Sequence, residues 1–226
     1  MDINYEYKPA FTLMTVSFNA GEQLKVEPGA MVAQSSGLNM KTGMSGSLIG
    51  GFMKKAFGGE SFFVNTYTAT KDGDWISLAP SSPGDIDTFN LQANGSLFIQ
   101  PGSYLASTNN VVTTTKFQGA KSLLSKEGAF FIKATAEGSE GVVYYNAYGA
   151  IKSIEISPEN PVIVDNGHVV AFTEGLSYNV TKVGGLGSAI LGGEGVVLNF
   201  SGKGTVFIQT RNLTSLAGSL MPFMRT

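Results

Sequence analysis

The chain has 226 residues, a net charge of −2 and 29 glycines, and only 14% of its residues are charged. Nucleic-acid binding depends on clustered lysine and arginine, and the densest basic spot here is Lys54 with Lys55, so no nucleic-acid partner is expected. The chain contains no cysteine, which excludes disulfides, thiolate metal sites and cysteine nucleophiles and fits a reducing cytosol.

The N-terminal residues predict no targeting segment. Residues 1–11 include Asp2 and Glu6 and contain no apolar run of the kind that forms a signal peptide. The longest weakly polar stretch, residues 186–200, contains Glu194 and falls short of the roughly 18 apolar residues of a membrane-spanning helix. We therefore expect a soluble, cytoplasmic chain.

Three segments of the chain predict the same strand, turn and strand. They are residues 24–33, 97–106 and 162–171. Aligned on Gly29, Gly102 and Gly167, each has apolar residues three and five positions before the glycine and alanine four positions after it. Pro-Gly and Asn-Gly form tight turns because glycine adopts positive φ without strain. We therefore predict equivalent structural turns at these three glycines.

Two further landmarks follow each turn in the same order. The first is an apolar pair near a Gly/Glu cluster, and the second is two apolar residues three positions apart. The pairs are Phe62-Phe63, Phe130-Phe131 and Val196-Val197, then Ile86 with Phe89, Ile151 with Ile154, and Leu213 with Leu216. Apolar runs that alternate with turn residues at this spacing are typical of a β-sandwich or barrel.

The chain is therefore predicted to be all-β, with three pseudo-symmetric repeats packed about a pseudo-threefold axis. We expect a single domain over residues 1–226, with repeats at about 11–91, 92–157 and 158–217 and a short C-terminal tail. The apolar tail is expected either to pack on the core or to form an oligomer interface.

The loop at residues 43–57 is the longest of three variable segments between the landmarks. It contains flexible glycines, two lysines and several large apolar side chains, which would gain by burial. Two interpretations remain open: a flap over the sandwich core, or an amphipathic contact to a partner or membrane. In the second, Leu48, Phe52 and Met53 are the candidate partner contacts.

No catalytic constellation emerges from the sequence. His168, the only histidine, occupies the position of Ala30 and Ser103 in the other segments, which favours a structural or surface role. Glu60 and Glu194 occupy equivalent positions, where hydrogen bonds to turn backbone are the favoured role. A hydrolase that uses Glu60 or Glu194 with His168 remains an alternative, and no cofactor or metal is expected.

Several segments together resemble one known family over nearly the whole chain. They are Val26–Ala33, Gly58–Phe63, Leu78–Ile86, Gln100–Gly102 and Val164–Phe172. They are similar to the altered-inheritance-of-mitochondria family of largely uncharacterised bacterial, archaeal and fungal proteins. The resemblance implies a fold like that of the tryptophan RNA-binding attenuation protein, related to double-stranded β-helices, and a link to mitochondrial inner-membrane organisation. It carries no established catalytic residue.

The leading functional hypothesis is a non-enzymatic scaffold or binding protein that acts as a homo-oligomer, with a membrane-associated protein as a further partner. It rests on the low charge, the apolar loops and the missing catalytic constellation. The fold resemblance also suggests a small-ligand-binding protein, with Trp75, Tyr144 and Tyr145 as candidate lining residues.

Overall fold

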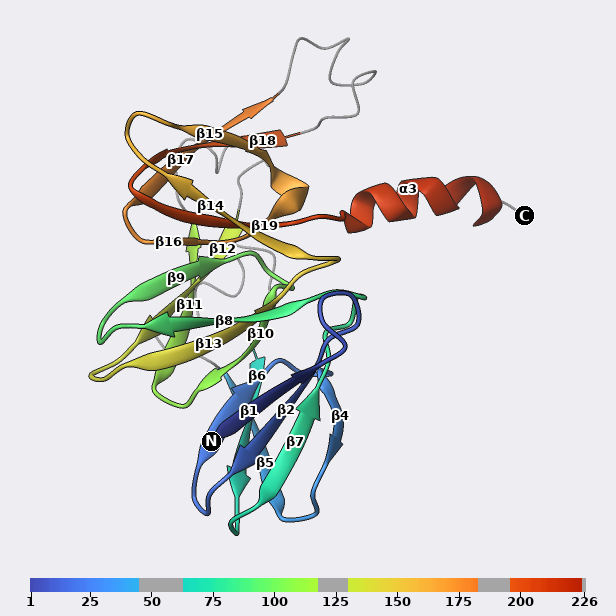
Figure 1. The fold of residues 1–226 in the computed structure, drawn as a ribbon, viewed down its shortest axis with the longest axis vertical. Coiled ribbons are helices and arrows are strands. Elements are labelled where there is room, and N and C mark those ends of the chain that lie inside the picture. The colour runs from blue at the N-terminus through green and yellow to red at the C-terminus, as the bar shows by residue number, and fades with distance from the viewer. Residues whose placement is uncertain (45–62, 118–129, 183–195, 225–226) are drawn as a thin grey trace.

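The computed structural model describes residues 1–44, 63–117, 130–182 and 196–224 (Figure 1). The described part of the chain is nearly all β, as the sequence predicts, and its strands form several antiparallel sheets. The candidate contacts Leu48, Phe52 and Met53, and the carboxylates Glu60 and Glu194, lie outside the described residues.

Four sheets are stacked along the long axis of the molecule, with the N-terminal strands at one end and the C-terminal strands at the other (Figure 1). The first sheet has the order β1-β2-β7-β4, with bounds Asp2–Glu6, Leu13–Phe18, Asp74–Leu78 and Met31–Gln34. The second has the order β5-β6-β3-β10-β13-β8, with bounds Leu38–Met44, Phe63–Ala69, Gln23–Val26, Tyr104–Thr108, Gly141–Asn146 and Ile86–Leu91.

The other two sheets contain the remaining strands. The third has the order β11-β12-β9-β16-β19-β14, with bounds Val111–Phe117, Phe130–Ala136, Ser96–Ile99, Val169–Thr173, Gly204–Gln209 and Ile151–Ile156. The fourth has the order β15-β18-β17, with bounds Val162–Asp165, Val196–Gly202 and Leu176–Lys182. The 3₁₀ helix η2 spans Asn166–His168, and the helix α3 spans Leu213–Met224.

The strand pairings follow one scheme in each third of the chain, where the thirds are the three expected repeats at about 11–91, 92–157 and 158–217. The strands that begin the three segments, β3, β9 and β15, pair with β6, β12 and β18. The strands that follow the turns, β4, β10 and β16, pair with β7, β13 and β19, and each of these pairs has a register shift near its start. The 120° rotation expected to relate the thirds stays a prediction.

Successive thirds are joined by backbone pairing. Strand β10 pairs with β3, and β16 pairs with β9, so each six-stranded sheet takes strands from two neighbouring thirds. The Lys25 ammonium reinforces the first joint, because its Nζ donates a hydrogen bond of 2.8 Å to the carbonyl oxygen of Val111. The joints are therefore part of the sheets themselves.

Three hydrophobic clusters lie along the stack. The first gathers Met14, Leu24 and Ile76 among others, and the second centres on residues such as Leu97 and Tyr145. The third is aromatic and centres on the buried ring of Phe172. That ring stacks on Phe98 at 4.9 Å and meets Phe131 edge-on at 4.9 Å, while Phe200 lies 5.3 Å away. Buried side chains of this size each contribute roughly 1.5–3 kcal/mol, so every level of the stack has its own core.

Two of the three predicted turn glycines have the expected geometry. Gly29 and Gly102 have φ of 90° and 86°, and the amides of Ala30 and Ser103 close the turns on the carbonyls three residues earlier. Gly167 differs, because its φ is not positive and it lies within η2. The Asp165 carboxylate accepts a 2.9 Å hydrogen bond from the Gly167 amide, and this cap favours a 3₁₀ turn over a positive-φ turn.

The last landmark also differs from its expected counterparts. The residue pairs near 86 and 151 begin strands β8 and β14, which pair with β13 and β19 of the following third. Leu213 and Leu216 instead lie in α3. This segment forms a helix, whose backbone groups bond to one another and need no partner strand.

Glu27 gives a test of the joint between the first two thirds. Its amide donates a 2.8 Å hydrogen bond to the carbonyl of Leu105 across that joint. Burial raises the pKa of the Glu27 carboxyl from 4.5 to about 7. The folded state therefore favours the protonated acid, and this stabilising effect, full below pH 4.5, is lost as the pH rises through 7.

We expect Glu27→Gln to raise the melting temperature at pH 8 by about 2–4 °C, the shift that roughly 1 kcal/mol produces in a chain of this size. At pH 4.5 the change should be small, because glutamine replaces an already neutral acid. Thermal unfolding at both pH values checks this, with the exposed Glu6→Gln as control. A lower melting temperature at pH 8 would show that the Glu27 carboxylate makes a stabilising contact.

Candidate functional site

Two acidic residues near turns, Asp74 and Asp85, serve structural roles. The Asp74 carboxylate accepts hydrogen bonds from the Ser35 hydroxyl at 2.8 Å and from the Thr70 and Lys71 amides at 3.0 and 3.1 Å. Burial by itself raises the pKa of Asp74, but these hydrogen bonds outweigh burial and the pKa lies below its ordinary value. Asp85 accepts from the Thr12 hydroxyl at 3.0 Å and pairs with Lys8 at 3.3 Å. These carboxylates hold turns and joints together.

The residues around η2 and the start of α3 form the most developed polar arrangement outside the sheets. The Asn212 side-chain oxygen accepts hydrogen bonds from the amides of Thr214 and Ser215 at 2.8 and 3.2 Å, and so caps the helix. The Gln209 amide group donates to the Gly167 carbonyl at 2.8 Å. Gly167 packs against Asn212 so closely that a Cβ at position 167 would overlap the Asn212 amide nitrogen.

His168 lines a hollow of about 410 Å³ beside this helix start. The other lining residues are Tyr148, Thr210, Arg211, Asn212, Ser215, Leu216 and Ser219. The His168 ring is fixed, because Nδ1 lies 2.7 Å from the Gln209 carbonyl oxygen. A carbonyl only accepts, so Nδ1 carries the proton and Nε2 of the neutral ring is left as an acceptor.

The lining of this hollow offers polar groups without an acid–base pair. None of the described residues that line it is Asp or Glu, so none of these can orient His168 as a carboxylate does in a catalytic triad. The Ser219 hydroxyl donates a 2.7 Å hydrogen bond to the Leu216 carbonyl, which directs its proton to the helix backbone. The structural role expected for His168 fits its bond to Gln209.

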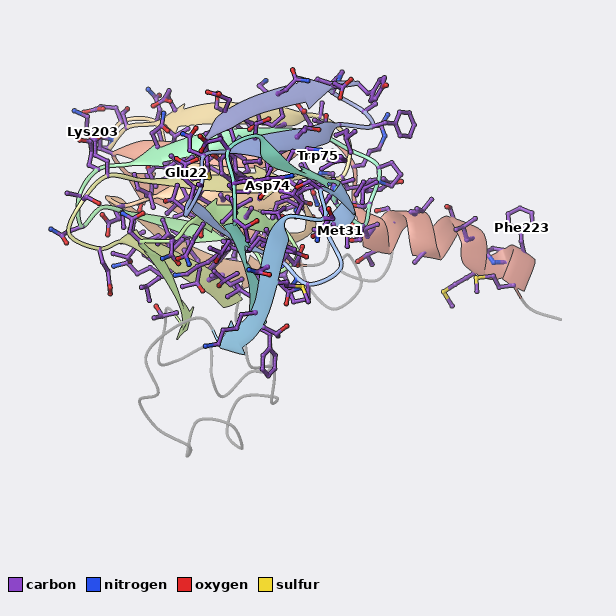
Figure 2. The ribbon with its side chains drawn as sticks, turned by 90° about the horizontal axis from the view of Figure 1, so that it is seen from below. Glu22, Met31, Asp74, Trp75, Lys203 and Phe223 are labelled. Atoms are coloured by element: carbon purple, nitrogen blue, oxygen red, sulfur yellow. The ribbon has the colours of Figure 1, made fainter. Side chains whose placement is uncertain are left out.

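Helix α3 extends away from the sheets and buries none of its residues (Figures 1 and 2). Its large side chains are apolar and exposed, and Phe223, labelled in Figure 2 near the far end of the helix, is 84% exposed. The others are Leu213, Leu216, Leu220, Met221 and Met224. Of the two roles expected for the tail, packing on the core is therefore wrong. The other, an oligomer interface, remains open.

The aromatic residues proposed to line a ligand site do not gather around one hollow. Tyr144 is buried in the first hydrophobic cluster and Tyr145 in the second, and their side chains are 4% and 1% exposed. Burial raises the pKa of Tyr144 to about 12. Trp75 lies on β7, belongs to neither cluster and is 37% exposed. The three side chains are therefore spread over separate parts of the stack.

Sequence analysis missed Asn212 and the residues that join α3 to the last sheet. The signal was present, because asparagine directly before Leu-Thr-Ser is a typical N-cap. It was overlooked because Leu213 and Leu216 matched a pattern that marks strands elsewhere in the chain. No helix in the described part of the chain is both long and apolar enough to cross a membrane.

Comparisons with known proteins agree over nearly the full chain. A family model described as mitochondrial biogenesis AIM24 matches residues 3–211. An uncharacterised protein of Streptococcus pyogenes serotype M6 is 29% identical in an alignment of 223 positions, which covers 96% of this chain and 88% of that protein. A crystal structure of a Streptococcus pyogenes protein is similar with a TM-score of 0.78 and 27% identity, over 99% of both chains.

The contact between Gly167 and Asn212 makes a specific prediction. We expect Gly167→Ala to displace the Asn212 side chain and cost about 1 kcal/mol, the usual value of a lost helix cap. Thermal unfolding and proteolysis at α3 would measure the effect. In an Asn212→Ala background, Gly167→Ala should cost much less, because the side chain it displaces is gone. Equal costs in both backgrounds would contradict the contact.

Proposed function

The chain belongs to the mitochondrial biogenesis AIM24 family. We propose that it is a non-enzymatic scaffold or binding protein that acts as a homo-oligomer. The observation that carries the proposal is α3, an apolar helix with no buried residue. Leaving large apolar side chains in water forgoes roughly 1.5–3 kcal/mol for each, so a surface that covers them stabilises the assembly. Exposed apolar surface of this kind marks interaction sites.

The amino-acid composition also supports assembly into an oligomer. Only 14% of the residues are charged, against roughly 25% in average soluble domains. A low charge density suits a chain that buries part of its surface against other copies. The described residues that line the hollow beside His168 supply polar groups and no carboxylate, which favours binding over acid–base hydrolysis.

A membrane-associated protein partner is the second candidate, and α3 is the observation that favours it. The helix has no charged residue between Leu213 and Met224, and it stands clear of the sheets, where a partner can reach all its faces (Figure 1). Amphipathic or apolar helices of this length are typical ligands of grooves on partner proteins. A cytoplasmic location, which the absence of cysteine from the sequence favours, is part of this proposal.

We expect the purified full chain to sediment as a homo-oligomer at micromolar concentration in analytical ultracentrifugation. If α3 is covered by another copy, the double variant Leu220→Ser with Phe223→Ser weakens assembly and leaves the melting temperature of the sheets unchanged, because neither side chain is buried. Thr214→Ala, a polar change on the same helix, is the control. A monomer over the whole concentration range would overturn the oligomer proposal.

The second candidate predicts that the full chain floats with native membrane vesicles and loses this binding when the vesicles are first treated with protease. The same Leu220→Ser, Phe223→Ser variant should bind less. Binding that survives the protease treatment would point to lipid and contradict a protein partner. Absence of binding to untreated vesicles would remove the candidate.

A further inference from the structure

The two smaller sheets, β1-β2-β7-β4 and β15-β18-β17, together contain the strands needed to form a third sheet of the same kind as the two six-stranded sheets, with β1 as an extra strand. The two six-stranded sheets have the orders β5-β6-β3-β10-β13-β8 and β11-β12-β9-β16-β19-β14. Adding six to each strand number of the first sheet gives the second, so both sheets have the same order. Placing the free edge of β15 beside β4 gives β17-β18-β15-β4-β7-β2, which is the same order. Strand β1 then lies outside β2 at the far edge.

The two in-chain joints give the register for such a contact. Across the first joint Ala106 lies opposite Val26, and across the second Ala171 lies opposite Ile99. Each joint also has a backbone hydrogen bond of 2.8 Å just beyond these pairs, from the Glu27 amide to the Leu105 carbonyl and from the Gln100 amide to the Val170 carbonyl. The same backbone geometry therefore occurs twice.

The unpaired edges are exposed where their counterparts are buried. Strands β10 and β16 are buried at every residue except the last. Their counterpart β4 is exposed along most of its length, with Met31 43% and Val32 58% exposed; Met31 is labelled in Figure 2. On the other edge, Ile163 of β15 is 64% exposed, whereas Phe98 at the same position of β9 is 7% exposed.

The exposed side chains of both edges are apolar, and the sequences of β4 and β15 contain neither lysine nor proline; Asp165, at the end of β15, is their one charged residue. Both strands are short, and β4 has a register shift near its start, but the same shift occurs in β10 and β16, which still pair with β3 and β9. Apolar edges of this kind are able to pair with other strands. The two edges belong to opposite ends of the stack, with both six-stranded sheets between them (Figure 1), so the partner strand comes from another molecule.

We propose that β15 of one copy pairs antiparallel with β4 of a second copy and completes the third six-stranded sheet. The proposal rests on the homo-oligomer proposed above and gives it an interface at the sheet edges, separate from the one considered at α3. The in-chain joints place Ala33 opposite Val164 and Gln34 opposite Ile163, with the Asp165 amide donating to the Val32 carbonyl. The two surfaces differ, so the chains associate head to tail, and the assembly closes into a ring or continues as a filament according to the rotation between copies.

Disulfide formation tests the register directly, because the natural chain has no cysteine. Ala33 and Val164 would form a pair without mutual backbone hydrogen bonds, whose Cα atoms are about 4.5 Å apart, within disulfide range. We expect the single variants Ala33→Cys and Val164→Cys to form disulfide-linked dimers when mixed and mildly oxidised, and neither to do so alone. Val32→Cys mixed with Val164→Cys is the control, because a shift of one residue places the thiols on opposite faces.

The outcomes separate this inference from the proposed function. Oligomers in the ultracentrifuge without a disulfide between positions 33 and 164, or with an equal yield at position 32, would overturn the β15–β4 contact and leave the oligomer in place. A chain that stays monomeric would overturn both. Linked dimers at the expected register with little product in the control support the contact.

Edge lysines give a second test that does not depend on oxidation. We expect Val32→Lys and Ile163→Lys each to raise the dissociation constant of the oligomer by roughly tenfold or more, because each places a charge in the joined sheet. Both side chains are exposed in the single chain, so its melting temperature should hardly change. Met40→Lys, at the exposed edge strand β5, is the matched control and should leave assembly intact. Unaltered assembly in both edge variants would overturn the contact.

Discussion

Backbone pairing between neighbouring thirds of the chain is the constraint on which the rest of the structure depends. The pairs β3 with β10 and β9 with β16 turn three sets of strands into continuous sheets, because each strand's amides and carbonyls need partners when they are buried. The joints bring Val26 and Ala106, and then Ile99 and Ala171, into buried positions. The hydrophobic clusters form around these shared sheets.

At the two ends of the stack, the described strands are not joined to a further third of the chain. At the N-terminal end, β2 takes the place beside β7 that β8 and β14 take in the later thirds, so that edge is occupied. At the C-terminal end the segment after Arg211 forms α3, capped by Asn212. Strands β4 and β15 keep one edge unpaired among the described residues. The apolar exposure of the molecule is therefore concentrated where the sequence of thirds begins and ends.

The distribution of exposed apolar side chains favours assembly over catalysis as the role of the surface. The buried carboxylates Asp74 and Asp85 are engaged by hydroxyls, amides and a lysine, which leaves them structural. His168 is bonded to backbone, and among the described residues no acidic side chain lines its hollow. Exposed apolar side chains, in contrast, lie on β4, β15 and α3, where Met31, Ile163 and Phe223 are among them.

The sequence by itself determined the all-β class, the family and the place of the tight turns, because Pro-Gly steps and alternating apolar residues act locally. It determined the positive φ of Gly29 and Gly102 for the same reason. Only the tertiary structure decided the 3₁₀ turn at Gly167, since a capping carboxylate and the close packing of Asn212 override the dipeptide's preference. It likewise decided that Leu213 begins a helix and that β4 and β15 are edge strands. Whether a segment forms a strand, and whether that strand lies at an edge, depends on which other strands are beside it.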